Sequence, residues 1–185
     1  MRISAGVWKG RRLEAPAGAR PTSSRAREAL FDILRETVPG ARVLDLYAGS
    51  GAVGLEAVSR GASRSVLVER ESAALDRNVE RLAPESDFVE VLRGDAAAAT
   101  RHLLARGDRF EIVFADPPYS GPVDDAVVRA APDLIAEGGV FVVQRDAAEH
   151  VPPEPEGMTL ALRRGYGRNV LYFFARVQSR FPARD

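Results

Sequence analysis

Apolar residues follow two different spacings along this chain, and the spacing changes repeatedly between residues 42 and 144. Short apolar runs, which are typical of buried strands, occupy residues 42–47, 64–69, 87–93, 110–115 and 138–144. The segments between them carry apolar residues at helical spacing, over residues 52–60, 72–82, 96–105 and 123–131. This alternation predicts parallel βαβ units and therefore an α/β fold with a doubly wound, Rossmann-like sheet.

The N-terminal part of the chain does not follow this alternation. The stretch "VWKG" is flanked by polar-apolar segments that predict a short β-hairpin over residues 2–16. A helix is expected over residues 25–38, with Ser23 or Ser24 as its N-cap and Pro39-Gly40 at its end. We therefore expect residues 1–38 to form a small hairpin and helix extension.

The C-terminal part also departs from the alternation. Residues 158–164 and 170–177 read as strands, and "GYGRN" between them predicts a terminal hairpin. With the five strands upstream, this gives a main domain over residues 39–185 with a mostly parallel seven-stranded sheet and a terminal antiparallel strand. A dinucleotide dehydrogenase would instead repeat its βαβ half here.

Composition narrows the class of protein. Apolar residues make up 45% of 185 residues, which is enough for a sizeable core. No run of about 18 apolar residues is present, and the first residues lack the apolar core of a signal peptide, so we expect a cytoplasmic protein without a membrane segment. There are no cysteines and only two well-separated histidines, so no metal site is expected.

The charge is zero overall but is distributed unevenly. Residues 1–42 carry nine Lys or Arg against four acids, and residues 163–185 carry six Arg against one acid, so each end has an excess of +5 and the middle has −10. Basic ends suggest that the ends hold an anionic partner. The alternative is a solvated surface with no partner.

A glycine-rich turn follows the first predicted strand of the main domain. In "VLDLYAGSGAVG", Gly49, Ser50 and Gly51 lie between a strand and a helix, and Gly54 completes G-x-G-x-x-G. Glycines at these positions let the backbone turn tightly and let a ligand approach the main chain. The same pattern occurs in nicotinamide enzymes, so it does not identify the cofactor by itself.

Three acids at the ends of successive strands favour a different adenosine cofactor. Asp45 would repel a pyrophosphate but suits a cationic amino group, Glu69 can accept both ribose hydroxyls, and Asp95 can accept from an adenine amino group while the Ala96 N–H reaches a ring nitrogen. Each acid has the alternative of a helix N-cap, most of all Asp95. Together the three acids fit S-adenosylmethionine, whose sulfonium and ammonium groups are positive.

The fourth strand of the main domain ends in "DPPY". Consecutive prolines end a strand because they cannot donate to its ladder, and the bland interpretation is a rigid exit from the sheet. The order "DLYAGSG", "VE", "GDA", "DPPY" resembles class I S-adenosylmethionine-dependent methyltransferases, and D-P-P-Y resembles those that act on exocyclic amino groups of bases. The resemblance implies that Asp116 and the Pro117 carbonyl hold the target amine, that Pro118 keeps this pair rigid, and that Tyr119 stacks on the base. The base must be unpaired or turned out of its helix.

The segments "RISAGVWKGRRLEAP", "RPTSSRAREALFDIL" and "LDLYAGSGAVGLEAVSRGA" extend the resemblance to the RsmD family over nearly the whole chain. That family implies transfer to N2 of guanine 966 in 16S ribosomal RNA, within an assembled or assembling small subunit, by a protein expected to be a monomer. Two positions depart from the family: Ser24 stands where Asp is usual, and Tyr47 where Phe is usual. The expected cofactor-binding residues are Asp45, Tyr47, Gly49, Ser50, Gly51, Glu69, Arg70, Asp95, Ala96 and Asp116.

The basic N-terminal extension is the expected substrate-binding part. Its basic side chains can meet phosphates, and Trp8 can stack on a base or, alternatively, pack on the sheet edge. The expected substrate-binding residues are Arg2, Trp8, Lys9, Arg11, Arg12, Arg20, Arg25 and Arg27. A weaker candidate is the group Arg163, Arg164 and Arg168. We expect that removing residues 1–20 leaves the cofactor crevice intact.

Three other functions compete with this interpretation. A DNA adenine or cytosine amino methyltransferase usually carries a target-recognition insertion, for which 185 residues leave no room. A nicotinamide oxidoreductase is disfavoured by Asp45 and by D-P-P-Y. A non-catalytic RNA-binding protein is disfavoured by the intact D-P-P-Y motif.

Overall fold

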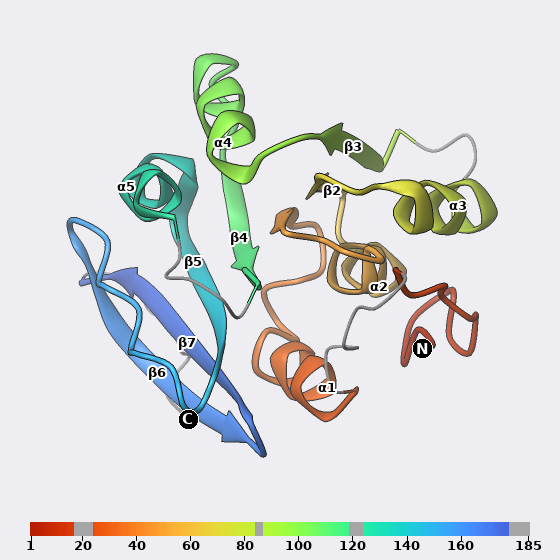
Figure 1. Ribbon diagram of the computed structural model, residues 1–185, viewed down its shortest axis with the longest axis horizontal. Helices are drawn as coiled ribbons and strands as arrows, with labels where there is room; N and C mark the ends of the chain where they lie inside the picture. Colours follow the sequence, from red (N-terminus) through yellow and green to blue (C-terminus); the bar gives the residue numbers. More distant parts are fainter. Residues whose placement is uncertain (17–23, 84–86, 119–123, 178–185) are drawn as a thin grey trace.

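A seven-stranded sheet with helices on both faces forms the body of the protein (Figure 1). The computed structural model describes residues 1–16, 24–83, 87–118 and 124–177. The strands are β1 (Arg42–Leu46), β2 (Arg64–Glu69), β3 (Val89–Arg93), β4 (Phe110–Ala115), β5 (Ile135–Asp146), β6 (Met158–Tyr166) and β7 (Asn169–Arg176). They lie in the order β3-β2-β1-β4-β5-β7-β6.

Strands β1 to β5 are parallel, and β7 is antiparallel to both β5 and β6. This arrangement confirms the predicted Rossmann-like sheet with an antiparallel terminal hairpin. Because the strand order reverses between β1 and β4, the carboxyl ends of these two strands border the crevice in which open α/β sheets bind ligands.

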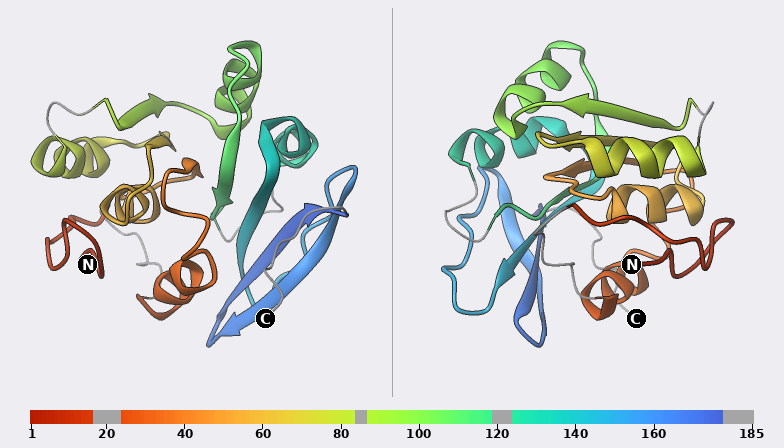
Figure 2. Two further views of the ribbon diagram at one scale, coloured as in Figure 1. Left: turned by 180° about the vertical axis from the view of Figure 1, so that it is seen from behind. Right: turned by 45° about the vertical axis from the view of Figure 1, so that its right-hand side comes forward.

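The helices are α1 (Ser24–Ile33), α2 (Ala52–Ser59), α3 (Ala73–Leu82), α4 (Ala96–Ala105) and α5 (Asp125–Leu134). Helices α4 and α5 cover one face of the sheet, while α1, α2 and α3 cover the other (Figure 2). The division follows from the strand period of two: Val43 packs toward α1 and α2, and its neighbour Leu44 packs toward α4 and α5. Burying each such side chain contributes about 1.5–3 kcal/mol.

Two elements differ most in length from their predicted ranges. Helix α1 ends at Ile33, and the chain continues in turns to Val38, where the Thr37 N–H bonds to the Leu34 carbonyl at 2.9 Å. The apolar spacing persists because Leu34 and Val38 remain buried, so the pattern alone does not mark the helix end. Strand β5 begins at Ile135, and its pairing with β4 is irregular between Phe110 and Ile112.

The N-terminal hairpin has a single β-bridge, between Arg2 and Arg12. It lies beside α2 (Figure 1). There the Val7 N–H donates to the Ser59 carbonyl at 2.8 Å. Ile3 and Leu13 are buried in a cluster with side chains of α2, β2 and α3. The extension is therefore packed on the main domain and shares its core. Within the described ranges, no helix is both long and apolar enough to span a lipid bilayer.

Candidate functional site

The glycine turn after β1 combines two different glycine requirements. Gly49 and Gly51 have φ values of +58° and +77°, which L side chains rarely adopt. A Cβ on Gly49 would meet no atom within 4 Å, whereas one on Gly54 would lie 2.0 Å from Leu67 Cδ2. Gly54 therefore lets α2 approach the sheet, and Gly49 leaves open space above the turn where a ligand can approach the backbone.

Asp45 lies beneath this turn and is only 2% exposed. Its Oδ2 accepts a hydrogen bond from the Gly54 N–H at 2.9 Å. Burial raises the pKa of the Asp45 carboxyl to about 7, and the nearby charges of Asp116 and Glu69 add to the shift, while the Gly54 N–H opposes it. A positive group bound beside this carboxyl would favour its ionised form.

Glu69, at the end of β2, holds the turn from the other side. One carboxylate oxygen accepts from the Gly49 N–H at 2.7 Å, and the other accepts from the N–H groups of Arg70 and Glu71 at 2.8 and 3.0 Å. A carboxylate has about four acceptor positions. It therefore keeps capacity for a ligand hydroxyl while fixing the glycine turn.

Asp95 shows the helix-cap role that sequence analysis left as the alternative. Its Oδ1 accepts from the N–H groups of Ala97 and Ala98 at 3.0 and 3.2 Å, and its Oδ2 lies 2.6 Å from the exposed Arg70 guanidinium. The Ala98 N–H, then Arg70 and Ala97, lower the pKa of Asp95. Ala96 is the first residue of α4, so its N–H has no partner within that helix. The expected contacts of these residues with adenine remain predictions.

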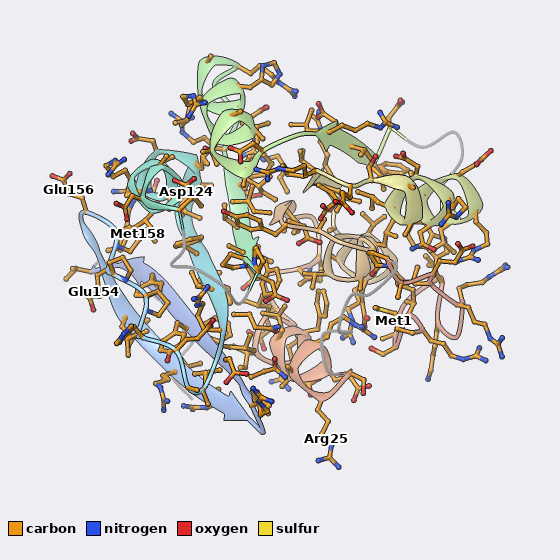
Figure 3. All side chains as sticks on the ribbon, in the orientation of Figure 1. Met1, Arg25, Asp124, Glu154, Glu156 and Met158 are labelled. Carbon is orange, nitrogen blue, oxygen red and sulfur yellow. The ribbon has the colours of Figure 1, made fainter. Side chains whose placement is uncertain are left out.

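Tyr47 follows β1 in a left-handed backbone conformation, with φ +62°, which is unusual for a bulky residue. Burial raises the pKa of its phenol to about 12, helped by the charges of Asp124 and Asp95. Asp124 is the N-cap of α5, at the end of that helix that follows D-P-P-Y in the chain (Figure 3). Tyr47 therefore lies between the cofactor turn and the far end of the predicted catalytic loop.

Asp116 and Pro117 lie where β4 ends beside β1. The Asp116 N–H donates to the Leu46 carbonyl at 3.4 Å, so the pairing of this segment with β1 continues to Asp116. Pro117 is buried and Pro118 is exposed, while Tyr119 lies outside the described residues. The side chain of Asp116 accepts a 2.9 Å hydrogen bond from Gln144 Nε2. The structure thus brings Asp116, Asp45 and the glycine turn together.

Three exposed basic residues of the extension, Arg2, Arg12 and Arg25, border a hollow of about 1110 Å³ between the hairpin and α1, which Glu28 also lines. Arg25 points outward from α1 (Figure 3). Lys9 and Arg11 are exposed on the hairpin, and Arg20 lies outside the described residues. Trp8 is half-buried against the core, which is the packing role given as its alternative.

The prediction that Arg27 binds the substrate was wrong. It was expected to meet phosphates, but its side chain is 2% exposed and pairs with Glu56 at 2.8 Å. Its Nη2 also donates to the Arg2 carbonyl at 2.7 Å. Since the guanidinium is enclosed between the hairpin, α1 and α2, it joins the extension to α2 and leaves almost no surface for RNA.

The weaker basic candidate lies on the terminal hairpin. Arg163 and Arg164 are exposed on β6, and the Arg163 guanidinium lies 5.7 Å from the centre of the Tyr172 ring. Arg168 pairs with Asp146 at 2.9 Å, which partly neutralises this group.

Two residues of the site were missed by sequence analysis. Gln144 contacts Asp116, and no local pattern marks it because β5 reads as a plain apolar run. Asn78 is fully buried on α3, where its side chain binds the backbone of Glu14 and donates to the Ser50 carbonyl at 2.9 Å. An asparagine on the apolar face of a helix was the available signal for this contact. It connects the hairpin to the glycine turn.

Comparison with known proteins finds a family and several relatives. The family profile described as "Conserved hypothetical protein 95" matches residues 1–175. The chain is 33% identical to Ribosomal RNA small subunit methyltransferase D of Escherichia coli strain K12, over 86% of this chain and 82% of that protein. It is 32% identical to Putative rRNA methyltransferase YlbH of Bacillus subtilis, over 90% and 94%. A solved structure of a hypothetical protein of Thermus thermophilus has a TM-score of 0.80 and 37% identity, covering 96% of this chain and 99% of that one.

Proposed function

This chain belongs to the RsmD family, and we propose that it transfers a methyl group from S-adenosylmethionine to N2 of guanine 966 in 16S ribosomal RNA of the small subunit. One observation carries the proposal: Asp116 and Pro117 lie next to β1, directly beside the glycine turn and the buried Asp45. A site for an adenosine cofactor and a pair of acceptors for an amino group are therefore adjacent.

The residues of the crevice fit S-adenosylmethionine. The open space at Gly49 admits a ligand to the backbone, and Glu69 has remaining acceptor capacity for a ribose hydroxyl. Asp45 is a buried acid with a pKa of about 7, so a neighbouring cation would stabilise its charge. When bound, the cofactor would supply a methyl group on a positive sulfur; attack by the amine nitrogen would break the carbon–sulfur bond, leave a neutral thioether and release one amine proton.

The role of Asp116 and Pro117 follows from the chemistry of the acceptor. The lone pair of an exocyclic amine is delocalised into the base, which makes the amine a poor nucleophile. Acceptors on its two hydrogens, the Asp116 carboxylate and the Pro117 carbonyl, would localise that lone pair and direct it. A small displacement of the reacting groups lowers the rate strongly, so a rigid backbone at Pro117 and Pro118 favours the reaction.

The basic hollow beside α1 supports an RNA substrate. Arg2, Arg12 and Arg25 border it, and the exposed Lys9 and Arg11 extend the positive surface along the hairpin. Phosphate contacts supply affinity and position the polymer without reading its bases. The hollow lies on the face of the sheet that α1 and α2 cover, which is also the face of Asp45 and the glycine turn.

The test is methyl transfer from labelled S-adenosylmethionine to small subunits isolated from a strain that lacks this modification. We expect label in 16S RNA, as N2-methylguanine at position 966, and none after Asp116→Ala. Subunits that carry adenine at position 966 serve as the matched control substrate. Double-stranded DNA serves as a second control substrate. Label in DNA, or equal label in the adenine-substituted subunits, would contradict the proposed target.

A further inference from the structure

Gln144 is a polar side chain in an otherwise apolar face of β5. Val140 and Val142 precede it on that face, where they pack with side chains of α1, α2 and β7. Gln144 is 1% exposed. Burying an amide costs free energy unless it is hydrogen-bonded, so its partner matters.

The partner of Gln144 is Asp116. Ala115 of β4 pairs with Val143 of β5, so Asp116 and Gln144 follow as neighbours on adjacent strands. Gln144 Nε2 donates to Asp116 Oδ2 at 2.9 Å. An ionised carboxylate only accepts hydrogen bonds, and this chemistry fixes which end of the amide faces Asp116.

We propose that Gln144 is a positioning residue for the reaction, an inference that rests on the proposed function. Its amide holds the Asp116 carboxylate in one rotamer at the end of β4. The β5 backbone fixes the amide in turn, because Gln144 is paired with Leu171 of β7 and lies inside the sheet. A carboxylate has about four acceptor positions, so one bond from Gln144 leaves capacity for the amino group of the base.

The alternative is that Gln144 only fills a polar gap at the end of the sheet. A structural role would lower stability when the residue is changed, whatever the state of Asp116. A positioning role acts through Asp116 alone, and it lowers kcat without changing the KM for S-adenosylmethionine.

The experiment is a double-mutant cycle with Gln144→Leu and Asp116→Ala, with thermal unfolding of every variant. Gln144→Leu places an apolar side chain of similar size beside Val142 and Leu171, so we expect an unchanged melting temperature. Its kcat should fall about 10- to 100-fold, with unchanged cofactor affinity by calorimetry. In the Asp116→Ala background, the same substitution should change kcat by less than about twofold. Equal losses in both backgrounds, or full activity of Gln144→Leu, would overturn the proposal.

A second measurement does not need the acceptor. If the wild-type protein transfers no methyl group to small subunits, the proposed function fails, and the inference is then judged by crystal structures of the wild type and Gln144→Leu. We expect Asp116 in one rotamer in the wild type and in several in the variant. The same single rotamer in both proteins would overturn the positioning role.

Discussion

The Arg27 guanidinium lies 2.8 Å from the Glu56 carboxylate, and the two side chains are 2% and 0% exposed. This buried ion pair joins α1 to α2, the helix that follows the glycine turn. Arg60 and Ser4 also bond to Glu56, so one carboxylate on α2 holds α1 and the hairpin together. The basic extension is thus partly a structural element, which leads to the first prediction.

Arg27→Met should lower the free energy of unfolding by about 3–5 kcal/mol, because it leaves the buried Glu56 charge without one of its two arginine partners. Arg60 remains beside Glu56, which places the expected value at the lower end. Urea unfolding measures this. Arg25→Met is the matched control, since Arg25 is exposed on the same helix and should not affect stability. Adding Glu56→Leu to Arg27→Met should restore part of the lost free energy of unfolding. If it restores none, the loss does not come from the unpaired Glu56 charge.

The stability of the protein should depend on pH through Asp45. The folded protein keeps the Asp45 proton up to a pKa of about 7, whereas an ordinary aspartate releases it near 3.8. The folded state binds more protons between these values, so stability should fall as pH rises through this window and level off above it. Asp45→Asn should flatten that slope. Urea unfolding of the wild type and of Asp45→Asn at about pH 5 and about pH 8 measures this change. If the free energy of unfolding changes equally with pH in the two proteins, Asp45 is not its source.

Glu69→Gln should weaken S-adenosylmethionine binding. A charged hydrogen bond contributes about 1.5–3 kcal/mol, so affinity should fall roughly 10- to 150-fold. Calorimetry measures the affinity, and Glu71→Gln is the control because Glu71 is an exposed acid two residues away. Equal affinities for Glu69→Gln and the wild type would remove Glu69 from the cofactor site.

Asp116→Ala should lose far more methyl transfer than cofactor affinity, because Asp116 lies outside the glycine turn. Loss of one acceptor on the amine should cost about 10²-fold in kcat, by comparison with ordinary positioning losses. Single-turnover transfer together with cofactor calorimetry separates the two effects. A variant with near-normal turnover would show that the carboxylate does not hold the target amine.

The RNA surface should be tested by point substitutions, since removing the hairpin would do more than remove RNA contacts. Ile3 and Leu13 are buried in the core, and Asn78 links Glu14 to the glycine turn, so we now expect deletion of residues 1–20 to reduce stability and cofactor affinity together. This replaces the expectation that the deletion spares the cofactor crevice. The combined variant Lys9→Ala/Arg11→Ala alters only exposed side chains.

Lys9→Ala/Arg11→Ala should weaken binding to small subunits and make it less dependent on salt. Each lost phosphate contact removes about 0.7–0.9 from the slope of log affinity against log salt, so the slope should become shallower by about 1.4–1.8. Arg109→Ala is the control, because Arg109 is an exposed residue before β4, at the opposite end of that strand from Asp116. If Lys9→Ala/Arg11→Ala and the wild type show the same salt slope, Lys9 and Arg11 do not contact phosphate.

The sequence determined the order of strands and helices, because the spacing of apolar residues records locally which faces are buried. It also placed Asp45, Glu69, Asp95 and Asp116 at or near strand ends, since each lies within two residues of the end of a predicted strand. The carboxyl ends of parallel strands lie at one edge of a sheet, so their gathering in one crevice followed from the pattern.

Only the tertiary structure decided what each side chain contacts. Arg27 and Arg25 look alike in the sequence, but only Arg27 meets Glu56, which lies 29 residues away. Gln144 reaches Asp116 across 28 residues because β5 lies beside β4, and no local spacing encodes that adjacency. A charged or amide side chain stands in the same local sequence pattern whether it contacts water or a buried partner. The difference lies in the free energy of desolvation, which is set by the elements that pack around it.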